Sequence, residues 1–141
     1  MKLNTYWITG FVDGEGCFSF SIFRNISMRA GYQIQGEFSV VQHKRNIQLL
    51  YALKDLFKCG TVSVNGSNSE IYHYRVKNNE HLLQIIIPFF EKYTLCSTKK
   101  FELPIFKQLC LNIKNKKHLT TEGFNEMKIL VEKLSDYKKK G

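Results

Sequence analysis

Two alternating stretches near the N-terminus constrain the fold more than any other feature of the chain. Residues 17–23, "CFSFSIF", alternate phenylalanine with serine, and residues 32–42, "YQIQGEFSVVQ", alternate Ile34, Phe38 and Val40 with polar residues. A period of two is that of a strand with one buried face. Because a basic loop joins the two stretches, they predict an antiparallel pair with one apolar and one polar face.

The remaining patterns are mostly helical, and either Asn4 or Thr5 is expected to be the N-cap of the first helix. Apolar residues at helical spacing and their flanking signals predict helices over residues 4–13, 46–57 and 79–87, a helix running through about 113, and an amphipathic helix over about 120–135. Pro88 is expected to end or kink the third helix, and Pro104 to lie in an early turn or make a bend.

A second strand pair and the element order complete the predicted fold. Residues 61–76 read as a hairpin that turns at "NGSN". The order helix, two strands, helix, two strands, helices predicts an α+β protein. A length of 141 residues favours one domain, 1–141, with a core of about 4–113 and a solvated basic tail at 138–141.

Charge and cysteine content narrow the class of partner. The net charge of +9 suits a polyanion, either a nucleic acid or an anionic membrane surface. Apolar runs such as "LLQIIIPFF" are too short and interrupted to span a bilayer, so no membrane span is expected. The four cysteines form no CxxC pair, which predicts buried thiols rather than a zinc site. With no signal-peptide pattern, an intracellular protein is expected.

The polar face of the predicted sheet suits the recognition of DNA. Amide and hydroxyl groups can read base edges while lysine and arginine hold phosphates, and a two-stranded ribbon fits the major groove. A plain solvated face is the alternative. The residues expected to bind DNA are Ser19, Ser21, Phe23, Arg24, Asn25, Arg29, Gln33, Gln35, Glu37, Ser39, Lys44, Arg45, Thr61, Ser63, Asn65, His73, Arg75 and Lys77.

The nonapeptide "ITGFVDGEG", residues 8–16, combines glycines with acids at the end of the first helix. Gly14 and Gly16 are expected to end that helix. Glycine inside a helix costs about 1 kcal/mol against alanine, and close approach of another helix is the usual compensation. A second subunit could supply that helix, with Thr9, Gly10, Asp13 and Gly14 at the interface. Packing on the same domain is the alternative.

The two acids of the nonapeptide suggest a metal site. A carboxylate at a helix C-terminus faces the negative end of the helix dipole, and a divalent cation would reverse that penalty. Mg²⁺ takes few protein carboxylates and completes its shell with water and phosphate oxygens. Two subunits would bring two such acids together, an arrangement suited to metal-assisted phosphodiester cleavage.

The nonapeptide resembles the motif that names the LAGLIDADG homing endonucleases. It retains the motif glycines, both acids and the closing glycine, and the predicted elements match that family's αββαββα core over residues 4–135. The resemblance implies that Glu15 and the Gly14 carbonyl bind Mg²⁺, for which Ca²⁺ or Mn²⁺ can substitute, and that Asp13 is structural. Glu15 stands where the family name has aspartate.

The same resemblance assigns further residues and a function. Gln42 matches a polar position that places water or metal, and Lys99 or Lys100 matches a lysine beside the scissile phosphate. The implied function is a homodimeric endonuclease that cuts both strands of a long pseudo-palindromic DNA site. A non-cleaving intron RNA maturase, binding its own intron RNA, or a DNA-binding regulator is the alternative. The lysine, asparagine, isoleucine and phenylalanine content suggests an AT-rich gene and hence an organelle.

Overall fold

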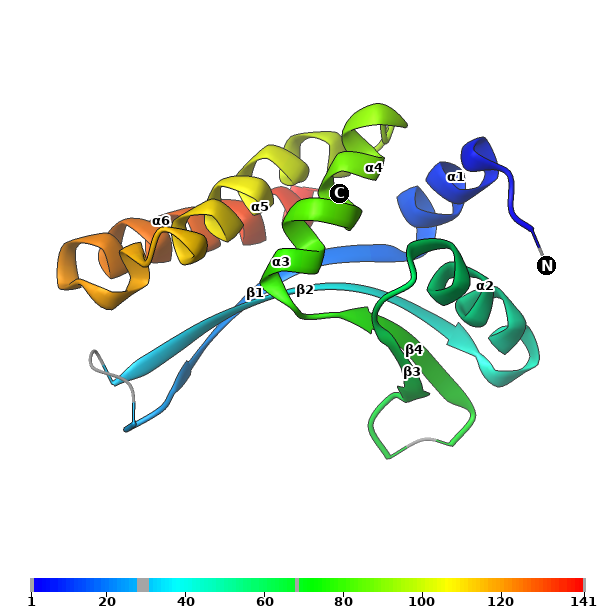
Figure 1. Ribbon diagram of the computed structural model, residues 1–141, viewed down its shortest axis with the longest axis horizontal. Helices are drawn as coiled ribbons and strands as arrows, with labels where there is room; N and C mark the ends of the chain where they lie inside the picture. The colour runs from blue at the N-terminus through cyan, green and yellow to red at the C-terminus, as the bar shows by residue number, and fades with distance from the viewer. Residues whose placement is uncertain (1, 28–30, 68, 141) are drawn as a thin grey trace.

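The protein is built on one four-stranded antiparallel sheet. A computed structural model describes residues 2–27, 31–67 and 69–140, and Figure 1 shows its arrangement. The spatial order is β1-β2-β4-β3. The strands are β1 (Gly16–Arg24), β2 (Tyr32–His43), β3 (Thr61–Val64) and β4 (Ile71–Val76). Both predicted strand pairs are confirmed, and the α+β class with them.

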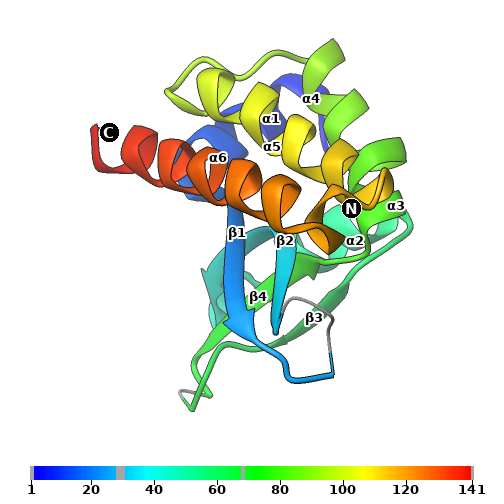
Figure 2. The same ribbon diagram turned by 90° about the vertical axis from the view of Figure 1, so that its left-hand side faces the viewer.

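The helices all lie on one side of this sheet (Figures 1 and 2). The opposite face is left uncovered, and the β1–β2 and β3–β4 hairpins splay apart so that this face is concave. The helices are α1 (Thr5–Glu15), α2 (Ile47–Phe57), α3 (Asn79–His81), α4 (Ile87–Lys92), α5 (Lys99–Lys114) and α6 (Thr121–Lys140), with a π-helical turn at Leu82–Ile86 and 3₁₀ turns at Lys44–Asn46 and Lys117–Leu119.

Aromatic side chains fill the layer between the helices and the sheet. Phe18, Phe38, Phe90 and Phe106 are fully or almost fully buried, and the rings of Phe18 and Phe106 lie 5.2 Å apart between centroids. Each such burial contributes about 1.5–3 kcal/mol. Tyr74 is also buried, and its hydroxyl donates a 2.8 Å hydrogen bond to a main-chain carbonyl. The alternation predicted from the sequence therefore assigns the apolar face to the helices.

Three element boundaries differ from the predictions. The first helix continues to Glu15, so Gly14 lies within its last turn and only Gly16 caps it. The third helical segment continues past Pro88 to Lys92. A π-helical turn precedes Pro88, which stands in the first turn of α4, where its missing N–H is tolerated. The last helix includes the basic tail and continues to Lys140.

The cysteines only partly match the prediction of buried thiols. Cys59 and Cys110 are buried, but Cys17 is half-buried and Cys96 is exposed, because Cys96 lies in the loop between α4 and α5. Burial raises the pKa of Cys110 to about 12. Within the described residues, no helix has both the length and the apolar character needed to cross a bilayer.

Candidate functional site: the end of the first helix and the concave sheet face

The first helix is fixed at both of its ends. The Asn4 side chain accepts a 2.8 Å hydrogen bond from the Tyr6 N–H, which confirms Asn4 as the N-cap. At the other end, the Gly16 N–H donates to the Val12 carbonyl. A Cβ at Gly16 would lie 2.7 Å from the Val12 side chain, so only glycine lets the chain pass from helix into β1 at this point.

Asp13 connects the end of α1 to the loop before α5. Its carboxylate accepts hydrogen bonds from the Ser97 hydroxyl at 2.6 Å and from the main-chain N–H groups of Cys96 and Ser97 at 2.9 Å each. The Lys99 ammonium donates to the Asp13 carbonyl at 2.8 Å. Residues more than 80 positions apart in sequence therefore hold the motif in place.

These contacts also control the ionisation of Asp13. Partial burial by itself would raise the pKa of its carboxyl. The Ser97 hydroxyl, the two main-chain N–H groups and the Lys99 charge outweigh that effect and lower the pKa from its ordinary value of 3.8. The carboxylate is thus kept charged and fully engaged in hydrogen bonds. This arrangement supports a structural role for Asp13.

Glu15 has the opposite environment, although it lies only two residues further along. It is exposed at the last position of α1, and no other residue in the described parts of the chain makes a hydrogen bond or ion pair with its carboxylate. In this last turn the Val12 carbonyl accepts from the Gly16 N–H and the Asp13 carbonyl accepts from Lys99, whereas the Gly14 carbonyl has no helical N–H donor. The end of α1 therefore offers the Glu15 carboxylate and the Gly14 carbonyl as hard-oxygen ligands.

Lys99 and Lys100 lie in different surroundings. Lys99 reaches the motif through its hydrogen bond to Asp13, whereas the Lys100 ammonium lies 5.1 Å over the Phe101 ring. Asp13 and Lys99 both line a depression of about 500 Å³, and Lys138 from the end of α6 lines it too. The position of Lys138 beside this depression was missed from the sequence, because the basic tail carried no signal beyond its charge.

Gln42 lies at the same end of the β1–β2 ladder as the motif. Gly16 pairs with Val40, two residues before Gln42, so the end of α1 and the end of β2 are neighbours. The Gln42 side-chain oxygen Oε1 accepts a 3.4 Å hydrogen bond from the Asn46 side-chain Nδ2. Asn46, which precedes α2, thus orients the Gln42 side-chain amide. This amide lies at the end of the β1–β2 ladder that is next to Glu15.

The outer face of α1 is open and partly aromatic. A Cβ at Gly10 or Gly14 would meet no heavy atom within 4 Å, and Tyr6 on the same face is 79% exposed. Gly10 borders a hollow of about 620 Å³. Thr9 differs from its prediction as an outward interface residue: it is buried and its hydroxyl donates to the Tyr6 carbonyl within the same helix.

The concave face of the sheet carries the polar side chains predicted to bind DNA. Cross-strand pairing places Ser19 opposite Glu37 and Ser39 opposite Arg75. The same pairing and alternation bring together Ser19, Ser21, Phe23, Gln33, Gln35, Glu37, Ser39, Thr61, Ser63, His73 and Arg75. Arg24, Asn25, Lys44, Arg45, Asn65 and Lys77 lie at strand ends and turns. Arg29 lies outside the described residues.

Charges on this face are paired with one another. The Glu37 carboxylate lies 3.5 Å from the Arg75 Nε and 3.8 Å from the Lys77 ammonium. The Arg75 Nε is buried without a hydrogen bond of good geometry, so the contact is an ion pair only. His73 is 4% exposed and does not itself present a ring to solvent, unlike the expectation that it would contact DNA directly.

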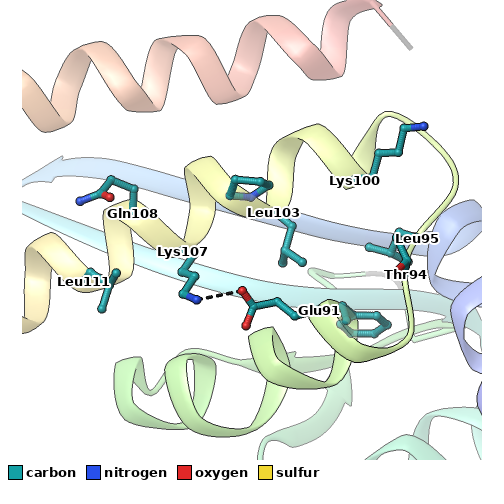
Figure 3. A pocket seen from close by; sticks show the side chains of 10 residues that line it. Glu91, Thr94, Leu95, Lys100, Leu103, Lys107, Gln108 and Leu111 are labelled. Atoms are coloured by element: carbon teal, nitrogen blue, oxygen red, sulfur yellow. Dashed lines mark hydrogen bonds and ion pairs between the residues drawn. The ribbon is translucent and has the colours of Figure 1, made fainter.

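One further hollow lies apart from the motif. It measures about 480 Å³ and lies between α4 and α5, and a 2.8 Å ion pair between Lys107 and Glu91 crosses it (Figure 3). Its lining includes Lys100 but no residue of the nonapeptide. Lys100 therefore lines this hollow, whereas Lys99 lines the depression beside Asp13.

The comparisons with known proteins agree with this architecture. The family model for LAGLIDADG endonucleases matches residues 8–110. A relative from Neurospora crassa, described as probable intron-encoded endonuclease 2, is 36% identical over 126 residues, which cover 89% of this chain and 28% of the relative. This chain belongs to the LAGLIDADG endonuclease family.

Two solved structures are similar to this chain but differ in how much of their own length it covers. The homing endonuclease I-TnaI has a TM-score of 0.87 and 36% identity, with 99% of each chain covered. I-SmaMI, solved on an uncleaved DNA target with calcium ions, has a TM-score of 0.86 and 33% identity, with 92% of this chain but 44% of I-SmaMI covered. The chain spans about a quarter of the length of three curated relatives that it matches, two from Neurospora crassa and one from Podospora anserina.

Proposed function

We propose that this chain is a site-specific DNA endonuclease that cuts both strands of a pseudo-palindromic target as a homodimer, with Mg²⁺ as its metal. The observation that carries the proposal is the contrast between two neighbouring acids. Asp13 is fully engaged by the loop before α5, whereas the Glu15 carboxylate is free and lies where α1 meets β1. A free carboxylate at a helix C-terminus opposes the helix dipole and suits a cation.

The donor set fits a divalent cation shared with a substrate. Glu15 and the Gly14 carbonyl supply hard oxygens, and the described residues contain no cluster of three metal-ligating side chains. Such a sparse set suits Mg²⁺, whose shell is completed by water and phosphate oxygens. Ca²⁺ or Mn²⁺ would occupy the same oxygens. When bound, the metal supplies Lewis acidity at the phosphate and lowers the pKa of water.

The remaining residues have separable roles. Gln42, fixed by Asn46, orients the attacking water through its amide group. Lys99 neutralises charge at the scissile phosphate, and its hydrogen bond to Asp13 places it beside the motif, which favours it over Lys100. Asp13 holds the loop that carries Lys99.

The outer face of α1 supports the proposed homodimer. Gly10 and Gly14 leave that face open to a second helix, and exposed Tyr6 and Trp7 extend it with apolar surface. A two-fold contact through this face brings two Glu15 residues together.

The concave face is the proposed DNA-binding surface. Its side chains are polar and its ends are basic, as at Arg24 and Lys44, in a chain of net charge +9. Phosphate contacts from the rim would position the duplex, and the strand side chains would read base edges. An organelle gene remains our expectation for its origin, because similar proteins are described as intron-encoded.

Replacing Glu15 by glutamine tests the proposal. Glu15→Gln retains size but removes the anionic ligand, so DNA binding should persist while cleavage in Mg²⁺ falls about a thousandfold or more, the worth of several kcal/mol at the transition state. Glu126→Gln, the same change at an exposed position on α6, is the matched control and should cleave normally. Normal cleavage by Glu15→Gln would exclude the proposed site. A wild-type chain that binds nucleic acid but does not cleave DNA in Mg²⁺ would instead favour the non-cleaving maturase or regulator.

A further inference from the structure

A buried histidine lies under the hydroxyl of a candidate base-reading residue. In the β3–β4 hairpin, His73 pairs across the ladder with Ser63. The Ser63 Oγ lies 2.9 Å from the His73 Nε2, and the Asn65 Oδ1 lies 3.3 Å from the His73 Nδ1. His73 is 4% exposed while Ser63 is exposed on the concave face. The His73 ring is therefore shielded from solvent, and it affects the concave face through its contacts with Ser63 and Asn65.

The atoms that face the two ring nitrogens indicate which tautomer His73 adopts. An amide oxygen only accepts, so the His73 Nδ1 must carry the proton that bonds to Asn65. In the neutral ring, Nε2 then has no proton and must accept one from the Ser63 hydroxyl. The single hydroxyl proton of Ser63 is thereby donated to the His73 Nε2. Only its oxygen lone pairs remain for an outside partner.

The charges around His73 favour the neutral ring. Burial lowers the pKa of His73, and the nearby cations Arg75 and Lys77 lower it further, while Glu37 opposes them. Because its pKa lies below the ordinary value of 6.5, the His73 ring is uncharged at pH 7. Ser63 is therefore held as an acceptor under ordinary conditions.

We infer that His73 is a positioning residue that makes Ser63 an obligatory hydrogen-bond acceptor toward DNA, so that Ser63 selects a base bearing an amino group. In the major groove these donors are the N6 amino group of adenine and the N4 amino group of cytosine, whereas guanine O6 and thymine O4 are acceptors. This inference rests on the proposed function, because it requires the concave face to contact the major groove.

Ser21 provides an internal comparison on the same face. It is exposed on β1, and the described structure gives its hydroxyl no side-chain partner. A free hydroxyl can rotate to donate or accept, so it discriminates poorly between amino and keto groups. Ser63 and Ser21 are thus expected to read DNA differently, because the Ser63 hydroxyl is bonded to His73 and the Ser21 hydroxyl is free to rotate.

Selection of bound sites from a randomised DNA pool, with Ca²⁺ at pH 7, tests the inference. Ser63→Ala should identify the base position that Ser63 contacts in each half-site, where the wild-type chain should prefer adenine or cytosine by roughly five- to tenfold. His73→Phe should remove that preference at this position alone. Asn65→Asp places a carboxylate on Nδ1 and stabilises the charged ring, so Nε2–H donates to Ser63 and the preference should move to guanine or thymine.

Ser21→Ala is the matched control and should leave the Ser63 position unchanged. A wild-type preference for guanine or thymine at that position, or no shift in Asn65→Asp, would overturn the inference. Equal loss at every position in His73→Phe would do so as well, since it would show a merely structural role. A wild-type chain that selects no sequence would overturn the proposed function itself and this inference with it.

Discussion

The end of α1 and the concave face of the sheet are held in place in different ways. At the end of α1, Asp13 is fixed by main-chain N–H groups and a hydroxyl from a loop more than 80 residues away. On the sheet, polar side chains mostly contact cross-strand neighbours, as Glu37 does with Arg75. Main-chain contacts fix a position tightly, whereas surface ion pairs contribute about 0–1 kcal/mol and can be exchanged for DNA contacts.

This difference suggests a division of labour between the two regions. Catalysis requires reacting groups to be held in one geometry, because small displacements reduce the rate strongly. Recognition requires side chains that can leave one partner for another. Variants at the end of α1 should therefore change cleavage more than binding, and variants on the sheet should change sequence preference more than the chemistry of cleavage.

The largest effect is expected at the outer face of α1. Gly10→Leu adds bulk where a Cβ meets no atom of the same chain, so the chain itself should fold normally or with slightly higher stability. The partner helix should be displaced, the dimer should dissociate, and double-strand cleavage should be lost. Sedimentation and thermal unfolding measure the two effects separately.

Gln48→Leu, at an exposed position on α2, is the matched control and should remain dimeric. A Gly10→Leu protein that sediments as a dimer and cleaves both strands would show that the open face of α1 is not the interface.

A smaller effect is expected from the two neighbouring lysines. Lys99→Met removes the ammonium that bonds to the Asp13 carbonyl, and we expect cleavage to fall by roughly 10–100-fold from lost stabilisation of phosphate charge. Lys100→Met removes an ammonium that lies over Phe101 and should cost less than threefold, consistent with an exposed cation–π contact. Single-turnover cleavage under saturating enzyme measures both. A reversed order of the two variants would assign the role to Lys100.

Arg75 is the test of the sheet. Arg75→Ala should weaken DNA binding by about 1–3 kcal/mol and relax preference at one position of each half-site if the guanidinium reads guanine. It also leaves Glu37 with only Lys77 nearby, so Glu37→Ala should restore part of the lost affinity. Binding titrations on single-base variants of the target measure both effects. Uniform weakening on all sequences would instead make Arg75 a phosphate contact.

The last effect is a dependence of stability on pH at Asp13. The pKa of Asp13 is lowered in the folded chain, so its stabilising contribution is present above its unfolded pKa, near 3.8, and is lost as pH falls through the lower folded value. Asp13→Ala should cost about 1–3 kcal/mol at pH 7. Thermal unfolding should show that this difference shrinks below about pH 4. A difference that grew on acidification would contradict the contacts assigned to Asp13.

Much of the fold follows from local patterns in the sequence. Alternation in 17–23 and 32–42 predicted both strands and their buried faces. Asn4 was predicted as one of two possible N-caps and is confirmed. These features succeed because the period of a strand and the cap of a helix depend on residues close in sequence.

Long-range contacts account for what the sequence did not reveal. The hydrogen bonds of Asp13 to Cys96 and Ser97, and the approach of Lys138 to the same depression, depend on how α5 and α6 pack. The extension of α1 to Glu15 was missed because Gly14 favours helix termination. The hydrogen bond from the Gly16 N–H to the Val12 carbonyl nevertheless closes the last turn. The burial of His73 depends on neighbouring strands rather than on its own strand.

The central claim is that each subunit contributes one Glu15 and cuts one strand. A tethered dimer with one wild-type unit and one Glu15→Gln unit tests it most directly, with supercoiled DNA carrying the target as substrate and Mg²⁺ as the metal. We expect nicked circles to accumulate, with little linear product, while the tethered dimer of two wild-type units produces linear DNA. Linear product from the mixed dimer at the wild-type rate would contradict the claim, because one carboxylate would then suffice for both strands.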